Sequence, residues 1–391
     1  FLWQIVHDKL DGGRVHDWPE RALESCPAVR GDRLWYVNNR AEVVCAVAST
    51  GAEVWNYDLI GKLGVFPHAW SASSPLLVGD TLFLVTGNGL DRGHLRLPAP
   101  NAPSFLALDA RTGRVRWRSS LPGRGILHGQ WSNPVYAEAG GKAQVVFPGG
   151  DGILYSCDPK TGELLWKFDC NPKGARAGFG GRATRLHFMA TPTVWQGKLC
   201  VGTGEDPEHR KGVGHLWCID IAKTPKNKDK DLSPWSPPGR APADFDPKDP
   251  RNKDSGLVWH YGGDAPEDHG KEYFFGRTLS TCAVHDRLCY AADYDGRVYC
   301  FDARTGKKHW EHEMKAETMS SPLWADGHVW IGNEKGQVLV FKHGKVKKLV
   351  RTNAFGRGCK VRAPLAALGG TLYVVTENPC RLWAIGTKGK P

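Results

Sequence analysis

The stretch FLALDARTGRVRW, residues 105–117, recurs as LYSCDPKTGELLW at 154–166 and as VYCFDARTGKKHW at 298–310. In all three copies a glycine stands four residues before the final tryptophan, and an aspartate stands four residues before that glycine. A spacing that is kept this strictly indicates one structural unit used several times.

Partial copies extend the count. Residues 44–55 keep the Thr-Gly and the tryptophan but have Val47 in the aspartate position, and 216–224 keep Asp220 but continue into an insertion before Trp259. A copy at 338–350 has lost both the aspartate and the tryptophan, and one at 382–391 has only the first half. A second landmark, a small or polar residue before proline, precedes six of the units; these prolines are Pro27, Pro75, Pro134, Pro192, Pro322 and Pro364. In the remaining unit Ala283 takes the proline position. Two independent landmarks therefore agree on seven units.

Each unit contains alternating apolar and polar residues in short runs separated by tight turns, which predicts four short antiparallel strands, A to D. The unit length of roughly 40–60 residues is that of a propeller blade. We therefore expect an all-β chain folded as a β-propeller, with seven blades of four strands. The chain is expected to be a single domain over 1–391, in which 222–255 form a solvated insertion, rich in Pro, Lys and Asp, in the C–D loop of the fourth unit.

The tryptophans of the repeat are predicted to pack between neighbouring blades. The residue two positions before the aspartate is small in nearly every unit, for example Cys45, Ala107 and Cys300, which leaves room for a large side chain beside it. The indole N–H then needs an acceptor, from the aspartate or from a nearby carbonyl. The candidate docking residues are Trp3, Trp55, Trp117, Trp166, Trp259 and Trp310.

The repeats ALDARTGRVRW, SCDPKTGELLW and CFDARTGKKHW resemble the tryptophan-docking repeats of PQQ-like β-propellers, a family that includes quinoprotein alcohol dehydrogenases and the BamB lipoprotein of outer-membrane protein assembly. The resemblance covers nearly the whole chain apart from 222–255. It implies a propeller fold and a periplasmic or extracellular location, and it leaves function open because propellers serve many functions.

The N-terminal FLWQIV is predicted to supply a missing strand. The chain encodes seven A, B and C strands but only six D strands after the first proline landmark, and FLW matches the tryptophan end of the repeat. Residues 1–6 would then pair with the strand near 382–385 and close the ring. The alternative is an eight-bladed ring that lacks one blade upstream.

Composition narrows the function classes only slightly. The net charge is +11 and the cysteine count is 11, without CxxC, a haem motif or zinc-ligand spacing. No apolar run is long enough to span a membrane. The basic residues are scattered over loops, so nucleic acid is a poor candidate partner, whereas a protein or an anionic polysaccharide remains open.

The B–C and D–A loops are long and varied, and they share the face of the ring that surrounds the central channel, where we place the site. The ligand-binding candidates on this face are His68, His94, His128, Trp131, Arg124, Arg182, Arg185, His209, His215 and Arg277. Asp206, Glu208 and His209 are candidate metal ligands, although their spacing matches no known metal motif, so a loop held by its own hydrogen bonds is the alternative.

No catalytic signature is recognisable, so we expect a binding or scaffold propeller that takes a protein or an anionic ligand on the basic loop face. The alternatives are a divergent quinoprotein oxidoreductase, or an enzyme acting on acidic saccharides in the channel. PQQ with Ca²⁺ is disfavoured as a cofactor because the chain lacks the vicinal cysteine pair that the resemblance to quinoprotein dehydrogenases implies.

Overall fold

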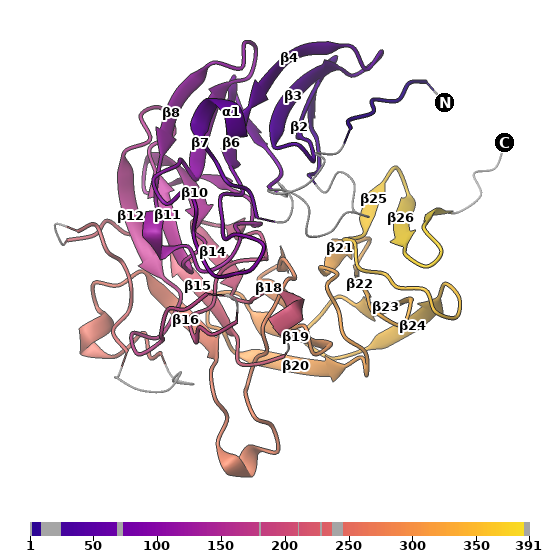
Figure 1. The fold of residues 1–391 in the computed structure, drawn as a ribbon. Helices are drawn as coiled ribbons and strands as arrows, with labels where there is room; N and C mark the ends of the chain where they lie inside the picture. The colour runs from indigo at the N-terminus through magenta and orange to yellow at the C-terminus, as the bar shows by residue number, and fades with distance from the viewer. Residues whose placement is uncertain are drawn as a thin grey trace.

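A computed structural model describes residues 2–8, 25–68, 73–179, 181–209, 211–226, 229–236 and 245–386. In this part of the chain the strands form seven antiparallel sheets, six with four strands and one with three, and each sheet uses strands that are consecutive in sequence. The sheets follow one another around a central axis, so that the colour of Figure 1 runs around the ring. The predicted all-β propeller is therefore confirmed.

The strands of the first four sheets, given sheet by sheet, are β1 (Ala28–Arg30), β2 (Arg33–Val37), β3 (Glu42–Val47) and β4 (Glu53–Asp58); β5 (Leu76–Val78), β6 (Thr81–Val85), β7 (Phe105–Asp109) and β8 (Val115–Ser119); β9 (Val135–Ala139), β10 (Lys142–Pro148), β11 (Ile153–Cys157) and β12 (Leu164–Asp169); β13 (Thr193–Trp195), β14 (Lys198–Gly202), β15 (His215–Asp220) and β16 (Leu257–Gly262).

The last three sheets comprise β17 (Ala283–His285), β18 (Leu288–Ala292), β19 (Arg297–Asp302) and β20 (Lys308–Glu313); β21 (Leu323–Ala325), β22 (His328–Gly332), β23 (Gln337–Lys342) and β24 (Leu349–Ala354); β25 (Ala366–Leu368), β26 (Thr371–Thr376) and β27 (Arg381–Gly386). The helices are short: α1 (Leu59–Leu63) and the 3-10 turns η1 (Gly123–Gly125), η2 (Pro207–His209), η3 (Pro250–Asn252) and η4 (Glu267–His269). None of the helices described has the length and apolar character of a membrane span.

The core lies in layers between adjacent sheets. One layer joins Val146 and Trp166 of the third sheet to Leu199 and Trp217 of the fourth, and comparable layers of buried side chains join the other consecutive sheets. The short first strands β5, β9, β13, β17 and β21 lie side by side around the axis. Consecutive sheets therefore bury their facing surfaces against each other and stabilise one another in order around the axis.

The repeat tryptophans occupy these layers in one recurring arrangement. Cys45 lies opposite Trp55, Ala107 opposite Trp117 and Cys300 opposite Trp310, so the small residue of the repeat makes room for the indole across the strand pair. Each indole lies against the next unit: a Cβ added at Gly113 would come within 2.7 Å of Trp55. The acceptor of the indole N–H is a backbone carbonyl, except for Trp166, which donates to the side chain of Gln144.

The carbonyls that accept these bonds follow the aspartate position of the next unit. Trp55 donates to Ala110, Trp117 to Pro159 and Trp259 to Ala303, at 2.9–3.1 Å. The aspartates instead hold their own turns, as Asp109 does by accepting bonds from the backbone N–H of Arg111 and of Thr112.

The predicted pairing of residues 1–6 with residues 382–385 is wrong for the described residues. Trp3 and Ile5 pack on the first sheet, against Tyr36 and Val44 among others, while the last sheet has only three strands and leaves Leu382 69% exposed. The physical reason is that the first unit offers Trp3 both a glycine surface, at Gly51, and a carbonyl acceptor, on Ala48 at 3.0 Å.

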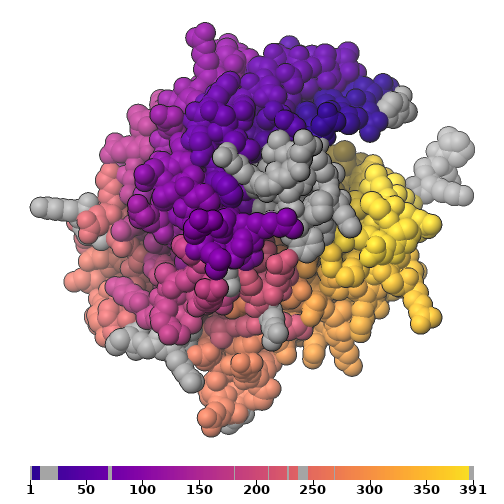
Figure 2. Space-filling model, in the orientation of Figure 1, coloured from indigo at the N-terminus to yellow at the C-terminus, as the bar shows by residue number. Residues whose placement is uncertain are grey.

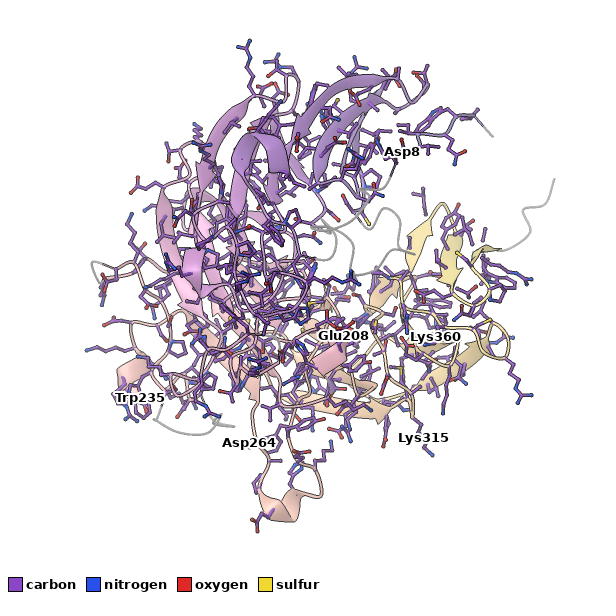
Figure 3. All side chains as sticks on the ribbon, viewed as in Figure 1. Asp8, Glu208, Trp235, Asp264, Lys315 and Lys360 are labelled. Atoms are coloured by element: carbon purple, nitrogen blue, oxygen red, sulfur yellow. The ribbon has the colours of Figure 1, made fainter. Side chains whose placement is uncertain are left out.

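The insertion between β15 and β16 was expected to be solvated, but its described parts are anchored. Leu232 is fully buried in the layer that contains Trp166, and its segment runs beside β12 through hydrogen bonds between Lys167 and both Lys230 and Leu232. Trp235, at the rim in Figure 3, lies under the guanidinium of Arg251, 3.2 Å from the ring centroid. The few apolar residues of the insertion therefore fix it to the third sheet.

Candidate functional site

The short A–B hairpins lie on one face of the ring, and the long B–C and D–A loops lie on the other. In the space-filling view, loops from the first half of the chain cover much of the middle of the visible face (Figure 2). These loops bring histidines from separate units together.

His68 lies at the end of the connection that follows α1. Its backbone N–H donates to Gly87 at 3.1 Å, and the N–H of Gly89 donates back to Phe66 at 2.9 Å, so residues 66–68 run antiparallel to 87–89. The imidazole Nδ1 lies 2.9 Å from the carbonyl oxygen of Leu90. A carbonyl can only accept, so Nδ1 carries the proton and Nε2 the lone pair.

His94 lies in the loop between β6 and β7, with a positive φ of 53°. Asp91 creates this turn: its carbonyl accepts from the N–H of His94 at 2.9 Å, and its carboxylate accepts from the N–H groups of Leu95 and Arg96. A left-handed conformation is uncommon for residues other than glycine, and histidine is among those that adopt it more often. This turn places the His94 ring next to His128, with 3.3 Å between their Nε2 atoms.

His128 lies on the connection between β8 and β9 and is 2% exposed. Its carbonyl accepts from the N–H of Leu90 at 3.0 Å. Gly89 permits this close approach, because a Cβ there would lie 2.6 Å from that carbonyl oxygen and 2.7 Å from the Cβ of His68. Burial lowers the pKa of His128, and neighbouring imidazoles lower it further, so the ring is neutral.

A fourth loop adds His209 at the end of η2. Its ring stacks on that of His128 with centroids 5.0 Å apart, and its Nδ1 lies 2.8 Å from the carboxylate of Glu205. The same carboxylate is 3.0 Å from the guanidinium of Arg277. Burial raises the pKa of Glu205, but the bond to His209 and the charge of Arg277 outweigh it, so the pKa is lowered. In turn, Glu205 raises the pKa of His209.

Two further buried rings, of Trp131 and His187, pack against the cluster. The ring centroid of Trp131 lies 5.0 Å from that of His128 and 5.7 Å from those of His68 and His187. Burial lowers the pKa of His187 to about 4. Neither ring nitrogen of His187, nor Nδ1 of His128, nor the indole N–H of Trp131 has a hydrogen-bond partner among the described residues.

The structure thus gathers His68, His94, His128, Trp131 and His209, with Arg277 beside them. The other candidates lie elsewhere. His215 forms a buried pair with His260, with 2.9 Å between ring nitrogens, and Arg185 binds the carboxylate of Asp169 at 2.8 Å. Arg182 is exposed, and Arg124 lines a groove described below.

Of the three predicted metal ligands, only His209 faces the cluster. Asp206 accepts the backbone N–H of Glu208 at 2.9 Å and so holds the turn of η2, while Glu208 is exposed. Glu208 nevertheless lies near the middle of the ring in Figure 3, which shows how far this loop reaches inward.

Sequence reasoning missed His187, although a signal was present. His68, His128 and His187 each precede the proline landmark of the following unit, Pro75, Pro134 and Pro192 respectively, by five to seven residues. These positions come just before the first strands of the units, which lie side by side around the axis, so equivalent side chains there lie close together. A histidine at that position in three successive units therefore predicts a cluster.

Comparison with known proteins identifies the family. The family model described as "Outer membrane protein assembly factor BamB" matches residues 2–237 and 251–376. Among solved structures, BamB from Moraxella catarrhalis superimposes with a TM-score of 0.59 at 15% identity, covering 94% of this chain and 84% of that one. A europium-containing methanol dehydrogenase gives a TM-score of 0.51 at 14% identity, covering 90% and 72%. These likenesses show the fold.

Two curated relatives are dehydrogenases. Polyvinylalcohol dehydrogenase of Sphingopyxis sp. (strain 113P3) is 23% identical over 80% of this chain and 44% of its own length. The dehydrogenase subunit of a quinone alcohol dehydrogenase of Gluconobacter oxydans (strain 621H) is 28% identical over 38% of this chain and 17% of its own length. The chain therefore spans less than half of either relative.

Proposed function

The chain belongs to the PQQ-like propeller family of the outer membrane protein assembly factor BamB, and from this premise we propose that it is a non-catalytic binding propeller that takes a protein partner on its loop face. We place this activity outside the cytoplasm, in the periplasm or at the cell surface, in keeping with the family description.

A groove on the loop face carries the proposal. It has a volume of about 630 Å³, and its walls are mostly apolar with charged groups among them; among the described residues it is lined by Phe66, Asp91, Leu95, Arg96, Leu97, Pro98, Pro100, Arg124 and Phe179. Leu95 is 61% exposed at this groove. Aromatic, aliphatic and arginine side chains around a shallow groove are the composition of a protein-binding surface.

The charges around a second cavity favour a protein rather than an anionic polymer as the binding partner. It has a volume of about 970 Å³, and acidic side chains (Asp264, Glu267, Glu272) face it alongside basic ones (Arg176, Lys271). Lys271 is moreover ion-paired with Glu311. A surface of mixed sign suits the mixed charges of a polypeptide better than a polyanion.

The quinone cofactor used by some members of this family does not fit the described residues. PQQ is a tricarboxylate and requires cationic or metal partners, but two of the candidate arginines are already paired with carboxylates: Arg277 with Glu205 at 3.0 Å and Arg185 with Asp169 at 2.8 Å. The centre is built instead from imidazoles, of which His128 and His187 are held neutral by burial. We therefore derive no redox step for this chain.

Site-specific photocrosslinking tests the proposal. A benzophenone amino acid is placed at Leu95 in the groove, and at Val346, 80% exposed in the hairpin between β23 and β24, as the matched control. In cells of the source organism we expect a discrete protein adduct from position 95 and none from 346. A probe at Phe179 should lose the same adduct when Leu95→Asp is added.

Equal adducts from both probes, or none from the groove, would contradict the proposal. So would dye-linked alcohol oxidation by the protein reconstituted with PQQ and Ca²⁺, which would instead establish the oxidoreductase alternative.

A further inference from the structure

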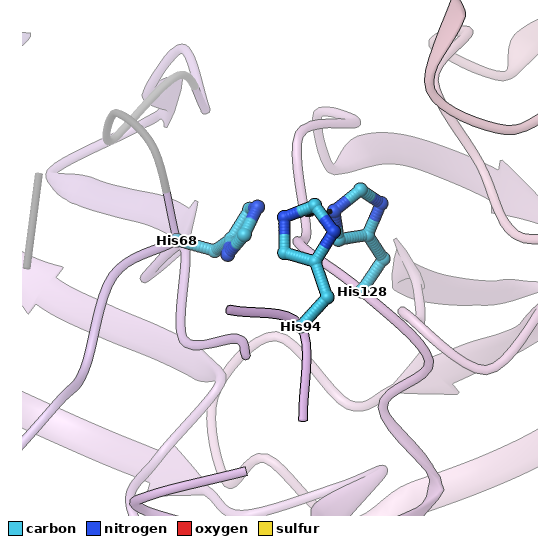
Figure 4. Close-up of side chains that lie close together, drawn as sticks. All are labelled: His68, His94 and His128. Atoms are coloured by element: carbon cyan, nitrogen blue, oxygen red, sulfur yellow. Dashed lines mark hydrogen bonds between the residues drawn. The ribbon is translucent and has the colours of Figure 1, made fainter. Parts of the chain in front are cut away.

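Three imidazoles from three different loops meet beside the groove. One ring nitrogen from each of His68, His94 and His128 lies within 4.8 Å of the other two, and Figure 4 shows the rings turned toward a common space. We propose that His68, His94 and His128 form a binding site for a divalent transition-metal ion of the Zn²⁺ or Cu²⁺ class.

The distance between two of the rings supports this geometry. Nε2 of His94 and Nε2 of His128 are 3.3 Å apart. Two nitrogens that each bind zinc at about 2.0–2.1 Å with a tetrahedral angle between them lie about 3.3–3.4 Å apart. The pair therefore already has the separation of two ligands, and a nitrogen of His68 within 4.8 Å of both completes a set of three.

The surroundings of His68 are those of a metal ligand. Its Nδ1–H donates to the carbonyl of Leu90 at 2.9 Å, which fixes the tautomer. Ligating histidines almost always donate their second N–H to a carbonyl or carboxylate in this way. The carboxylate of Glu205 orients His209, whose ring stacks on His128, by the same kind of bond.

The cluster also leaves buried polar atoms without partners. Nδ1 of His128 and both ring nitrogens of His187 make no hydrogen bond to the described residues, although these side chains are 2% and 1% exposed. Buried polar groups are nearly always satisfied, and each exception costs about 1–3 kcal/mol. The ion would bind Nε2 of His128, so a water held in this polar cluster is the partner that we expect for Nδ1 of His128 and for His187.

The chemistry of the ligands selects the class of ion. Neutral imidazole nitrogen suits Zn²⁺, Cu²⁺ and Ni²⁺, whereas Ca²⁺ and Mg²⁺ require oxygen ligands. Three protein ligands also leave a fourth position open, as in zinc sites that bind a water or an exogenous donor. The inference does not depend on the protein partner proposed above, because it rests on the ring geometry alone.

Metal titration of the chelator-treated protein tests the inference. Isothermal titration with Zn²⁺ should show one site, and Mg²⁺ and Ca²⁺ should show none. His94→Asn is the informative variant, because asparagine tolerates the positive φ of 53° and the side chain is only half buried, so the fold is kept. We expect a loss of zinc affinity of about 100-fold or more, beyond the loss typical of an outer-shell change. His328→Gln, at the start of β22 on the opposite face, should bind zinc like the wild type.

Co²⁺ provides a second readout that separates imidazole from thiolate ligands. The chain has 11 free cysteines, nine of them buried, and thiolates would also bind zinc. The proposal predicts d–d bands of a tetrahedral site without thiolate charge transfer, and both His94→Asn and His128→Gln should abolish them. Absence of zinc binding, zinc binding that His94→Asn leaves unchanged, or strong thiolate charge transfer would each overturn the proposal.

Discussion

Trp3 lies against Gly51, and its indole N–H donates to the carbonyl of Ala48 at 3.0 Å. Trp259 makes the same contacts with the unit that follows it, lying against Gly306 and donating to Ala303 at 3.0 Å. Trp3 therefore occupies the docking position of the first sheet, as each later tryptophan of the repeat does for the next unit. This arrangement, rather than a closing strand pair, fixes residues 2–8.

The close contact between a docking tryptophan and its glycine predicts a specific mutational cost. Gly113 has a φ of +69°, and a Cβ there would lie 2.7 Å from Trp55. Gly79 has a φ of +52°, and a Cβ added there would have no heavy atom within 4 Å. Both Gly→Ala variants carry the backbone strain of a positive φ, but only Gly113→Ala also disturbs the indole. Its free energy of unfolding should therefore fall by about 1–3 kcal/mol more than that of Gly79→Ala. Urea unfolding measures the difference; equal midpoints would show that the contact is unimportant.

One sheet uses a relay in place of the direct bond. Trp166 donates to the side-chain oxygen of Gln144 at 2.8 Å, and the Gln144 amide donates to the carbonyl of Ile221 at 3.0 Å. Ser156 donates to the same oxygen at 2.9 Å. Gln144→Met keeps the size but leaves three buried polar groups unpaired, so we expect a loss of about 2–4 kcal/mol in the free energy of unfolding.

A double-mutant cycle isolates the relay. If Ser156 acts through Gln144, Ser156→Ala should cost clearly less in the Gln144→Met background than in the wild type. Strictly additive losses would mean that the two side chains contribute independently.

A buried carboxyl makes stability depend on pH. Burial raises the pKa of Asp293 to about 6, although its oxygens accept bonds from Tyr299 and from the backbone of Arg297 and Gly276; the neighbouring Asp295 raises it further. Between about pH 4 and 6 the folded chain retains a proton that the unfolded chain has lost, so stability falls as pH rises, by up to about 1.4 kcal/mol per pH unit.

Asp293→Asn removes this titration. The variant loses some stability at every pH, but its fall in the free energy of unfolding from pH 4 to 6 should be smaller than that of the wild type. Part of the fall should remain, because burial also raises the pKa of Asp151 to about 6. Chemical denaturation at four pH values in this window measures it. An unchanged pH dependence would show that Asp293 does not hold the proton.

The features that could be predicted from the sequence are those that recur in several units. The docking tryptophans and their small cross-strand neighbours, such as Trp117 and Ala107, recur at fixed spacing, so the fold and blade count were accessible. The relay through Gln144 occurs once and leaves no periodic signal. The anchoring of the insertion depends on isolated apolar residues such as Leu232, whose burial depends on the neighbouring sheet.

The candidate site could be predicted only in part, because its geometry depends on contacts that do not recur from unit to unit. The long loops indicated the correct face, and most of the clustered histidines were candidates. Which loops meet at the centre depends on close backbone approaches, such as that of Gly89 to His128, which spacing along the chain does not reveal. The roles of the arginines could not be predicted either. Arg185 forms an ion pair with Asp169, and Arg277 forms one with Glu205, and only the folded chain brings these partners together.

The most direct test of the account is X-ray absorption at the zinc edge of the full chain loaded with one equivalent of Zn²⁺. If the loop face gathers His68, His94 and His128 around an ion, the spectrum should show three imidazole nitrogens at about 2.0–2.1 Å and a further light atom. A first shell dominated by sulfur at about 2.3 Å, or by oxygen without imidazole scattering, would contradict it.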